Sequence, residues 1–366
     1  MKVIISGGGT GGHIYPAIAI ANQLKTIDPT TQLLFVGAEG KMEMEKVPKA
    51  GYKIVGLPVV GIQRSLSLGN LLFPFKLISS LLKARTIIKN FKPDVAVGVG
   101  GFASGPLLMV ASIMGVPTLI QEQNSHAGIT NKLLAKRAKK ICVAYPDMER
   151  FFEASKIKLT GNPVRKDILD VGNKQEAAYS RFGLDSTKKT LLVIGGSLGA
   201  KTINESIEAG LKQFVEKGYQ VLWQTGKLYI DKAKAAVQEL KTNNVVVFDF
   251  IYEMDMAYSV ADVVVSRAGA LSVSELCIVG KPAILVPFPF AAEDHQTQNA
   301  LSLVNQSAAL MLRDQDAKNE LVAVTLGLLA DIKKQIELSK NIRTLAKPNA
   351  AQEIAEEVIK CMMYDV

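Results

Sequence analysis

The sequence predicts an α/β protein made of two doubly wound, Rossmann-like domains, and three observations lead to this prediction. The chain has 366 residues, 48% hydrophobic and 21% charged, which is long enough for two domains of about 100 to 200 residues each. Short apolar runs alternate with segments of helix length, as in strands joined by helical crossovers. A strand, a glycine loop and a helix occur in this order twice, at the N-terminus and near residue 190. We expect a first domain over residues 1–161 and a second over 162–366, with the last helix, about 350–366, able to pack back on the first domain.

The first domain begins with a strand over Val3–Ser6. A glycine loop, a helix through Ala17–Lys25 and a second strand over Gln32–Gly37 follow. This order is a βαβ unit, in which the two strands are parallel. Further apolar runs, separated by helix-length segments, extend the sheet at 54–60, 95–99, 116–121 and 140–144.

The second domain repeats this pattern after Gly161–Pro163. A strand in the run Thr190–Gly196 leads into another glycine loop and a helix, and later strands are expected near 220–224, 245–248, 262–266 and 283–287. Ligands of doubly wound sheets bind outside the carboxyl ends of the strands. We therefore expect the active site in a cleft between the two domains.

Cysteine usage and apolar patterning exclude several classes of protein. Cys142, Cys277 and Cys361 form no CxxC pair and no zinc-finger spacing, which favours a reducing compartment, the cytoplasm by default, and no structural zinc. Residues 95–120 carry no charge, but glycines and prolines divide them into runs too short to span a membrane. The N-terminus lacks the apolar core of an export signal. A soluble globular protein is expected.

The positive charge lies in one half of the chain. The whole chain carries +9; residues 1–163 hold 20 Lys and Arg against 9 Asp and Glu, a net charge of +11, and residues 164–366 carry −2. No acidic residue lies between Glu45 and Asp94. This asymmetry implies a cationic surface that faces an anionic partner.

The segment Leu71–Lys92 lies in this acid-free interval and is amphipathic. Two interpretations remain open. In the first, it is an interfacial helix that inserts its apolar face at the headgroup boundary while its cations meet anionic lipid. In the second, it is an ordinary helix that faces the core. The apolar residues are Leu71, Phe75, Ile78 and Leu82, supported by Leu72, Leu81 and Ile88, and the basic ones are Lys76, Lys83, Arg85 and Lys89.

Three glycine loops follow predicted strands and precede predicted helices: Gly7–His13 (GGGTGGH), Gly98–Gly105 (GVGGFASG) and Gly195–Ala200 (GGSLGA). Backbone amides without side chains can approach an anion, and a helix N-terminus adds about half a positive charge. The first loop matches GxGxxG but lacks the acidic residue about 20 positions later that a dinucleotide site needs, and a merely tight turn is the structural alternative. No GxxxxGK[ST] pattern occurs, which excludes a P-loop nucleotide hydrolase. The three loops favour a ligand with a diphosphate on one side and another anionic group opposite.

Several side chains near these loops are candidates for a role in the site. His13 directly follows the first loop, where it can accept a proton from a hydroxyl group, or instead cap the helix or bind a phosphate. Ser272 and Glu275 have the spacing of a capping box, in which the glutamate binds backbone amides and no ligand. A polar cluster over residues 287–300 follows a strand, where loops carry specificity. Asp314 and Asp316 match a DxD metal pattern, but their polar surroundings favour a solvated turn.

Six motifs, in this order, resemble the bacterial MurG family over almost the whole chain: GGGTGGH, GVGGFASGP, QEQNSHAGITNK (121–132), GNPVR (161–165), GGSLGA and RAGALSVSE. The resemblance implies the two-domain GT-B fold and an enzyme that transfers N-acetylglucosamine from UDP-GlcNAc to undecaprenyl-pyrophosphoryl-MurNAc-pentapeptide, lipid I, making lipid II for peptidoglycan. It implies no cofactor and no metal. The implied partners are lipid I, an anionic membrane at the cytoplasmic face of the plasma membrane, and other cell-wall synthesis proteins, with no nucleic acid.

The resemblance also implies roles for individual residues. Ser197 and Arg165 would approach the donor diphosphate, and Glu275 would bind the ribose hydroxyls, which replaces the capping interpretation. The other donor contacts would be the backbone of Ile251 at the uracil, Ala270 and Leu271 at the nucleotide, Gln296 and Asn124 at the transferred sugar, and Thr10, Gly11 and Gly12. The acceptor pyrophosphate would lie at Thr10 to His13 and at Gly100, Gly101, Phe102 and Ser104. Some relatives have two glutamines where this chain has His295 and Gln296.

In the chemistry that the resemblance implies, the 4-hydroxyl of MurNAc attacks the anomeric carbon of GlcNAc with inversion as UDP leaves. Helix-terminal amides and Arg165 can stabilise the leaving group without a metal, and His13 is the candidate base. One alternative is a non-hydrolysing UDP-GlcNAc 2-epimerase of the same fold, which needs no cationic apolar face. Another is a membrane-binding or nucleic-acid-binding module, although no nucleic-acid motif is present. A nicotinamide oxidoreductase is a remote third.

Overall fold

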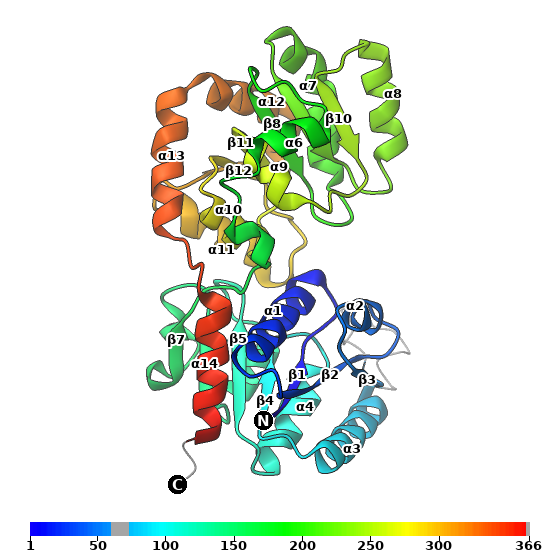
Figure 1. The fold of residues 1–366 in the computed structure, drawn as a ribbon, viewed down its shortest axis with the longest axis vertical. Coiled ribbons are helices and arrows are strands. Elements are labelled where there is room, and N and C mark those ends of the chain that lie inside the picture. Colours follow the sequence, from blue (N-terminus) through cyan, green and yellow to red (C-terminus); the bar gives the residue numbers. More distant parts are fainter. Residues whose placement is uncertain (60–72, 364–366) are drawn as a thin grey trace. The chain divides into compact units, whose positions relative to one another are not determined.

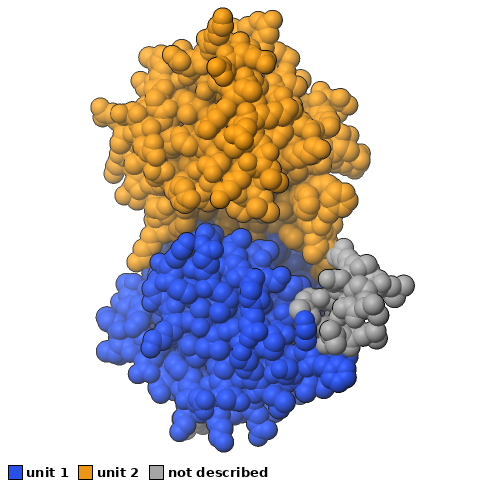
Figure 2. Space-filling model, turned by 90° about the vertical axis from the view of Figure 1, so that its right-hand side faces the viewer, with its two compact units in different colours: residues 1–164, 348–366 blue, residues 165–347 orange. Residues whose placement is uncertain are grey.

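The computed structural model describes residues 1–59 and 73–363 and divides into two compact units. Unit 1 comprises residues 1–164 and 348–366, and unit 2 comprises residues 165–347. Each unit is an open parallel sheet covered by helices (Figure 1), and Figure 2 colours the two units separately. The prediction of two doubly wound α/β sheets is confirmed. The chain passes from unit 1 to unit 2 between Val164 and Arg165 and returns at Pro348.

The sheet of unit 1 has the strand order β3-β2-β1-β4-β5-β6-β7, with every pairing parallel. From β1 the chain adds β2 and β3 toward one edge of the sheet, and from β4 it adds β5, β6 and β7 toward the other edge. The direction therefore reverses between β1 and β4, where Ser6 lies opposite Gly98. The strands are β1 (Lys2–Ser6), β2 (Gln32–Ala38), β3 (Ile54–Leu57), β4 (Val95–Gly98), β5 (Thr118–Glu122), β6 (Lys140–Val143) and β7 (Ile157–Leu159).

Helices cover both faces of this sheet. The helices of unit 1 are α1 (Gly11–Ile27), α2 (Glu43–Lys49), α3 (Phe73–Phe91), α4 (Ser104–Ile113), α5 (Ile129–Ala135) and α14 (Ala350–Met363). Short 3-10 helices lie at Met148–Arg150 and Ala154–Lys156. On one face, the C-terminal helix α14 joins α1 and buries Ile354, Ala355 and Val358 against the strands.

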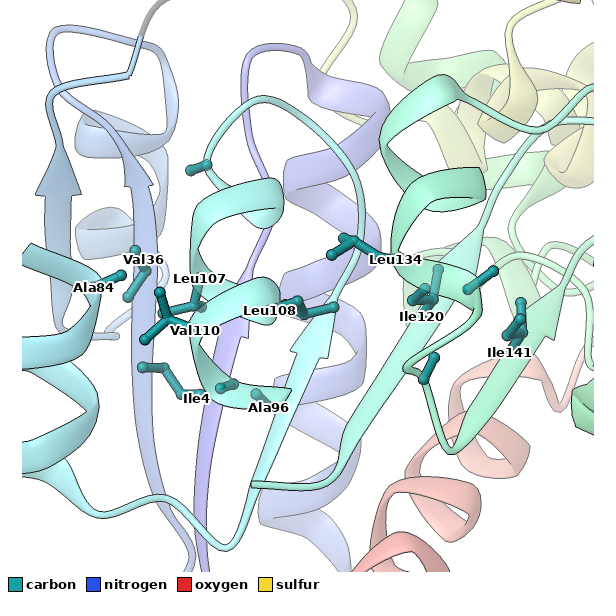
Figure 3. Close-up of a cluster of buried hydrophobic side chains, with 14 of the residues drawn as sticks. Ile4, Val36, Ala84, Ala96, Leu107, Leu108, Val110, Ile120, Leu134 and Ile141 are labelled. Carbon is teal, nitrogen blue, oxygen red and sulfur yellow. The ribbon is translucent and has the colours of Figure 1, made fainter. Parts of the chain in front are cut away.

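On the other face of the unit 1 sheet, α3, α4 and α5 enclose a second apolar core. Figure 3 shows Leu107, Leu108 and Val110 of α4 between the strand residues and the neighbouring helices. Ala84 of α3 and Leu134 of α5 extend the same cluster on either side (Figure 3). This packing fixes the N-termini of the helices that follow β4 and β5, and therefore the loops that precede them.

The sheet of unit 2 has the strand order β10-β9-β8-β11-β12-β13, again with every pairing parallel. Its direction reverses between β8 and β11, as the direction in unit 1 does between β1 and β4. The strands are β8 (Thr190–Ile194), β9 (Gln220–Gln224), β10 (Val245–Phe248), β11 (Val263–Ser266), β12 (Ala283–Leu285) and β13 (Leu310–Met311).

Unit 2 buries a cluster of apolar side chains between the sheet and α7, α8, α12 and α13, and this cluster includes the fully buried Trp223 of β9. The helices of unit 2 are α6 (Gln175–Phe182), α7 (Lys201–Glu216), α8 (Ile230–Leu240), α9 (Met254–Val260), α10 (Ala270–Val279), α11 (His295–Val304), α12 (Asp314–Ala330) and α13 (Ile332–Thr344). Short 3-10 helices lie at Lys166–Leu169 and Ala292–Asp294. The strands after β8 are added toward one edge of the sheet and those after β11 toward the other edge, so right-handed crossovers place the connecting helices of the two halves on opposite faces.

Three local features differ from the sequence prediction. The first helix begins at Gly11 and not near Ala17, because Thr10 is extended and the chain turns helical directly after it. The strand expected over 54–60 ends at Leu57 within the described residues. Two edge strands, β7 and β13, were not predicted, because they have only three and two residues and so lack a recognisable periodicity.

Candidate active site

Each unit carries two loops at the point where its strand order reverses. In unit 1 these loops follow β1 and β4, and in unit 2 they follow β8 and β11. Doubly wound sheets bind ligands at such topological switch points, outside the carboxyl ends of the strands. The three glycine loops and the segment Arg267–Ala270 occupy these four positions.

The two switch-point loops of unit 1 are in direct contact. The amide of Gly8 donates to the carbonyl oxygen of Gly100 at 3.3 Å. Gly101 has a positive φ of 87°, and a Cβ at this position would lie 2.4 Å from the carbonyl oxygen of Gly8. Only glycine allows this approach of two backbones. The sequence predicted the glycine loops but not that two of them form one structure.

The first loop ends with three amides that donate to no acceptor within the described residues. Gly8 donates to Gly100, and Gly9 donates to the Oε2 atom of Glu43 at 2.9 Å. By contrast, the amides of Thr10, Gly11 and Gly12 have no hydrogen-bond acceptor in the part of the chain that the structure describes. They form the N-terminus of the 17-residue helix α1, so donors and helix dipole combine into a site suited to an anion.

His13 lies in the first turn of α1, with its ring against the second loop. Its Nδ1 atom is 2.9 Å from the carbonyl oxygen of Gly8. A carbonyl oxygen only accepts, so Nδ1 carries the proton, and in the neutral ring Nε2 is the nitrogen that can accept one. A Cβ on Gly100 would lie 2.8 Å from Nε2. Both loops therefore fix the orientation of the ring.

The second loop presents Phe102 to solvent and turns Ser104 inward. The side chain of Phe102 is 56% exposed. The Ser104 hydroxyl is fully buried, and it lies 2.9 Å from the carbonyl oxygens of both Ser6 and Gly100. Ser104 thus ties the N-terminus of α4 to β1, and its hydroxyl group is occupied inside the loop.

The loop that carries Asn124 is held by the buried Glu122. One carboxyl oxygen accepts from the Asn124 amide at 3.0 Å, and the other accepts from the Gly128 amide at 3.0 Å and from the Asn131 side chain at 2.8 Å. These bonds fold residues 122–131 around a single side chain. Asn124 itself is half-buried at the end of β5.

The first switch-point loop of unit 2, Gly195–Ala200, is tied to β9 and to Ile251 by Gln224. The Gln224 Nε2 atom donates to the carbonyl oxygen of Gly196 at 3.0 Å, and its Oε1 atom accepts from the Ile251 amide at 2.9 Å. A Cβ on Gly199 would lie 2.0 Å from the carbonyl oxygen of Thr225. Ser197 is exposed at the tip of the loop.

Glu275 lies between a tyrosine and an arginine in unit 2. Its Oε2 atom accepts from the Tyr258 hydroxyl at 3.1 Å, and its Oε1 atom is 3.8 Å from Nε of Arg165. Burial raises the pKa of Glu275, while Arg165 and the Tyr258 hydrogen bond act against this rise. Burial, with Glu275 nearby, also raises the pKa of Tyr258 well above its usual value. The side chain keeps 13% of its surface exposed, so the carboxyl group can still meet a ligand.

The capping-box interpretation of Ser272 and Glu275 is wrong. Helix α10 begins at Ala270 with Gly269 at its N-cap position, so Ser272 lies inside the first turn. Glu275 binds side chains and not backbone amides. The [ST]xxE spacing occurs by coincidence within a helix that starts three residues earlier than the pattern implied.

Arg267 organises the segment that leads to Gln296. Its guanidinium donates to the carbonyl oxygens of Val286 and Pro287, each at 3.0 Å, and pairs with Asp314. The Phe288 amide in turn donates to Oε1 of Gln296 at 2.9 Å. This arrangement leaves the amide NH₂ of Gln296 as its donor group for a ligand.

The solvated turn expected at Asp314 is also wrong. Asp314 is the first residue of α12, where one carboxyl oxygen pairs with Arg267 and the other accepts from the Thr202 hydroxyl at 2.9 Å. The carboxyl group is thus used in joining β11, α7 and α12. Within residues 1–59 and 73–363, no three His, Cys, Asp or Glu side chains are grouped so that they could hold a metal ion.

Helix α3 presents one apolar face to the core and another to solvent. Ala84 and Ile88 are buried, whereas Phe75, Ile78 and Leu82 are 72%, 56% and 60% exposed. Leu81 and Ile88, expected to support the exposed face, instead contact the core. Leu71 and Leu72 lie outside the described residues. Lys76 and Lys83 are exposed beside this face, and Lys83 pairs with Glu39 at 2.6 Å.

None of the helices in the described residues is both long and apolar enough to cross a bilayer.

Sequence reasoning missed several residues that build the site. Glu43, Gln224 and Tyr258 were not identified as candidates. Glu122 and Arg267 occur in the motifs of the resemblance, but no role was predicted for them. A buried carboxylate or arginine has no local pattern, because its partners lie far away in the chain. The proximity of Glu122 to Asn124 in QEQN was the one local signal.

Comparison with protein families gives the class of the molecule. Residues 3–143 match the glycosyltransferase family 28 N-terminal domain, and residues 190–357 match the glycosyltransferase family 28 C-terminal domain. Together with two parallel sheets that carry loops at their switch points, these matches define a glycosyltransferase of the GT-B fold. The predicted fold class and the prediction that the chain is an enzyme are confirmed.

Relatives at high identity narrow this class. The chain is 57% identical over 364 residues to the UDP-N-acetylglucosamine–N-acetylmuramyl-(pentapeptide) pyrophosphoryl-undecaprenol N-acetylglucosamine transferase of Cytophaga hutchinsonii, covering 100% of this chain and 98% of that protein. It is 55% identical over 359 residues to the same transferase of Parabacteroides distasonis, covering 98% of each. The crystal structure of Acinetobacter baumannii MurG matches with a TM-score of 0.79 and 30% identity over 98% of this chain and 99% of that one. The chain belongs to the MurG family of glycosyltransferases, as its motifs suggested.

Proposed function

We propose that this protein transfers N-acetylglucosamine from UDP-GlcNAc to the 4-hydroxyl of MurNAc in lipid I, with inversion at the anomeric carbon, and so produces lipid II. The observation that carries the proposal is the identity of 55–57% over essentially the full length to transferases named for this donor and this acceptor. Such similarity spans both units, so it includes every loop described above.

Unit 2 is proposed to bind the donor. The exposed Ser197 and the half-buried Arg165 would contact the diphosphate. The charge of the diphosphate grows as UDP leaves, and fixed donors would stabilise that charge. Glu275, oriented by Tyr258, would accept from the ribose hydroxyls. Gln296, with its NH₂ group as donor, and Asn124 of unit 1 would contact the transferred sugar. The backbone of Ile251 and the residues Ala270 and Leu271 would meet the nucleotide.

Ile251 has one feature that limits its role. Its amide is already bonded to Gln224. A contact with uracil would therefore use its carbonyl oxygen as an acceptor, which suits the N–H group at position 3 of the base.

Unit 1 is proposed to bind the acceptor pyrophosphate. The amides of Thr10, Gly11 and Gly12 point to no acceptor in the described chain. Gly100, Gly101 and Phe102 lie on the second loop, which contacts the first loop at Gly8. Ser104 is proposed to position this loop, because its buried hydroxyl group donates to the carbonyl oxygens of Ser6 and Gly100. His13 is proposed as the base, since its Nδ1 proton is held by Gly8 and Nε2 can accept the proton of the attacking hydroxyl.

The transfer reaction is tested with purified protein, labelled UDP-GlcNAc and a MurNAc-pentapeptide acceptor joined through pyrophosphate to a short prenyl chain. We expect UDP release that depends on the acceptor and a β-linked disaccharide product. Formation of UDP-ManNAc without an acceptor would instead support a 2-epimerase. The structures of such epimerases, for example that of Neisseria meningitidis at 15% identity and a TM-score of 0.69, resemble this chain in fold alone.

We further propose that unit 1 attaches peripherally to an anionic membrane at the cytoplasmic face of the plasma membrane, where lipid I would be reached. Phe75, Ile78 and Leu82 leave an apolar face of α3 in solvent. The half of the chain that contains them carries a net charge of +11. Each lysine near an anionic surface contributes about 1 kcal/mol, and partial insertion of three large apolar side chains adds to this attraction.

Vesicle co-sedimentation tests the membrane proposal. Binding should increase with the fraction of anionic lipid and decrease with salt, and the double variant F75S/I78S should lose most of it. Ile336→Ser is the matched control, because Ile336 is 63% exposed on unit 2, and it should bind like the unchanged protein. Equal binding by both variants would contradict a membrane role for α3. Association with other cell-wall synthesis proteins remains an expectation from the resemblance.

A further inference from the structure

Glu43 is a fully buried carboxyl group beneath the first glycine loop. It is the first residue of α2, and its two oxygens bind two different backbone segments. Oε2 accepts from the Gly9 amide at 2.9 Å, and Oε1 accepts from the Ala38 amide, at the end of β2, also at 2.9 Å. A single side chain therefore joins the loop after β1 to the end of the neighbouring strand.

The chain leaves space for this side chain on two sides. A Cβ on Gly8 would lie 2.1 Å from Oε1 of Glu43, and a Cβ on Gly37 would lie 2.5 Å from its Cγ. Both glycines have ordinary backbone angles, since neither is among the residues with positive φ. Glycine at these two positions is therefore explained by the volume of the Glu43 side chain and not by backbone conformation.

The Glu43 carboxyl group has no cationic partner among the described residues. The nearby Lys46 and Lys49 pair with Glu45 instead. Burying a carboxyl group without a counter-ion costs several kcal/mol unless hydrogen bonds compensate for the lost water. A negative charge beside a loop suited to anions would also repel the anion. The contribution of Glu43 therefore lies in the hydrogen bonds that it accepts from the two backbone amides.

We propose that Glu43 is a positioning residue for the acceptor site. By binding the Gly9 amide, it turns that amide inward and holds Gly9 at a positive φ of 85°. With Gly9 in this conformation, the next three amides, those of Thr10 to Gly12, point to the acceptor pyrophosphate. Glu43 thereby determines which amides meet the acceptor pyrophosphate, and this inference rests on the proposed function of unit 1.

The test replaces Glu43 with glutamine, which has nearly the same shape but only one accepting oxygen. In Glu43→Gln one of the two amides faces an NH₂ group and loses its acceptor. We expect KM for the acceptor analogue to rise about tenfold or more, the change that corresponds to about 1.4 kcal/mol. The dissociation constant of UDP, measured by calorimetry, should stay within twofold, because the residues proposed to contact the uridine lie in unit 2.

Two further variants separate positioning from stability. Gly37→Ala lies outside the loop and displaces the Glu43 side chain, so it should raise the same KM. Ile141→Val removes a methyl group from the buried core of unit 1, so it should lower the melting temperature without changing KM. If Glu43→Gln and Gly37→Ala lower only stability and leave KM within twofold, the inference is wrong. If the unchanged protein transfers no sugar, the proposed function itself fails.

Discussion

Gly101→Ala tests whether the contact between the two loops of unit 1 supports the acceptor site. Gly101 has a φ of 87°, and its Cβ would lie 2.4 Å from the carbonyl oxygen of Gly8. Cβ atoms essentially never approach closer than 3.0 Å, so the loops would have to separate by about 0.6 Å. The Gly8 carbonyl also accepts from His13, so this separation would turn the proposed base as well.

The size of the effect has two parts. Alanine at a positive φ costs about 1 to 2 kcal/mol of stability wherever it occurs. Separation of the loops adds the loss of the hydrogen bond from Gly8 to Gly100, about 1 kcal/mol. Misplacing reacting groups by about 1 Å can cost roughly 100-fold in rate. Because the loops separate by about 0.6 Å, we expect kcat/KM for the acceptor to fall by a smaller factor, about tenfold.

The matched control is Gly115→Ala. Gly115 also has a positive φ, 79°, but a Cβ there would have no atom within 4 Å. Both variants share the backbone cost, and only Gly101→Ala disturbs the loops. Initial rates with a soluble acceptor analogue, together with urea unfolding, measure the two parts separately. Equal catalytic constants for the two variants, at equal loss of stability, would refute the reasoning.

Three other predictions concern single side chains. Tyr258→Phe removes a hydrogen bond that lowers the pKa of Glu275, and the pKa of Glu275 should therefore rise further. On acidification, the affinity for UDP-GlcNAc should then begin to fall at a higher pH than in the unchanged protein. Superimposable titrations of binding against pH for the two proteins would contradict this. Asp314→Asn breaks the largely buried pair with Arg267 and should lower the free energy of unfolding by about 3 kcal/mol in urea titrations, whereas a change near zero would mean that the pair is dispensable. His13→Ala should reduce kcat by about 100-fold or more, and near-normal turnover across the pH range would exclude it as the base.

Much of the fold could be predicted from the sequence, because the evidence for it is local. Buried parallel strands appear as short apolar runs, and glycines after them mark the turns into helices. The two strand–loop–helix repeats therefore located both sheets. The start of α1 was misplaced because Gly11 and Gly12 have poor helix propensity. Their place in the first turn follows from the extended Thr10 and the contacts of the preceding loop.

The site was only partly predictable, for a related physical reason. Glycine loops have a local pattern, whereas a buried polar group is defined by partners that the fold brings close. Glu43 binds Gly9 from 34 positions away, and Gln224 binds Ile251 from 27 positions away. In α3, the helical spacing of apolar residues was visible, but two apolar stripes compete for the core. Ala84 and Ile88 contact the core, which leaves Phe75, Ile78 and Leu82 in solvent.

The strand and helix alternation, the glycine loops, the family and the basic half of the chain can all be recognised in the sequence, because each depends on residue type at short spacing. Three facts needed the folded chain: the loops of unit 1 touch, Glu275 binds Tyr258 and is not part of a capping box, and the stripe of α3 with Phe75, Ile78 and Leu82 faces solvent. These facts depend on which distant groups the parallel sheets bring within hydrogen-bonding or packing distance. No local pattern of residues encodes that proximity.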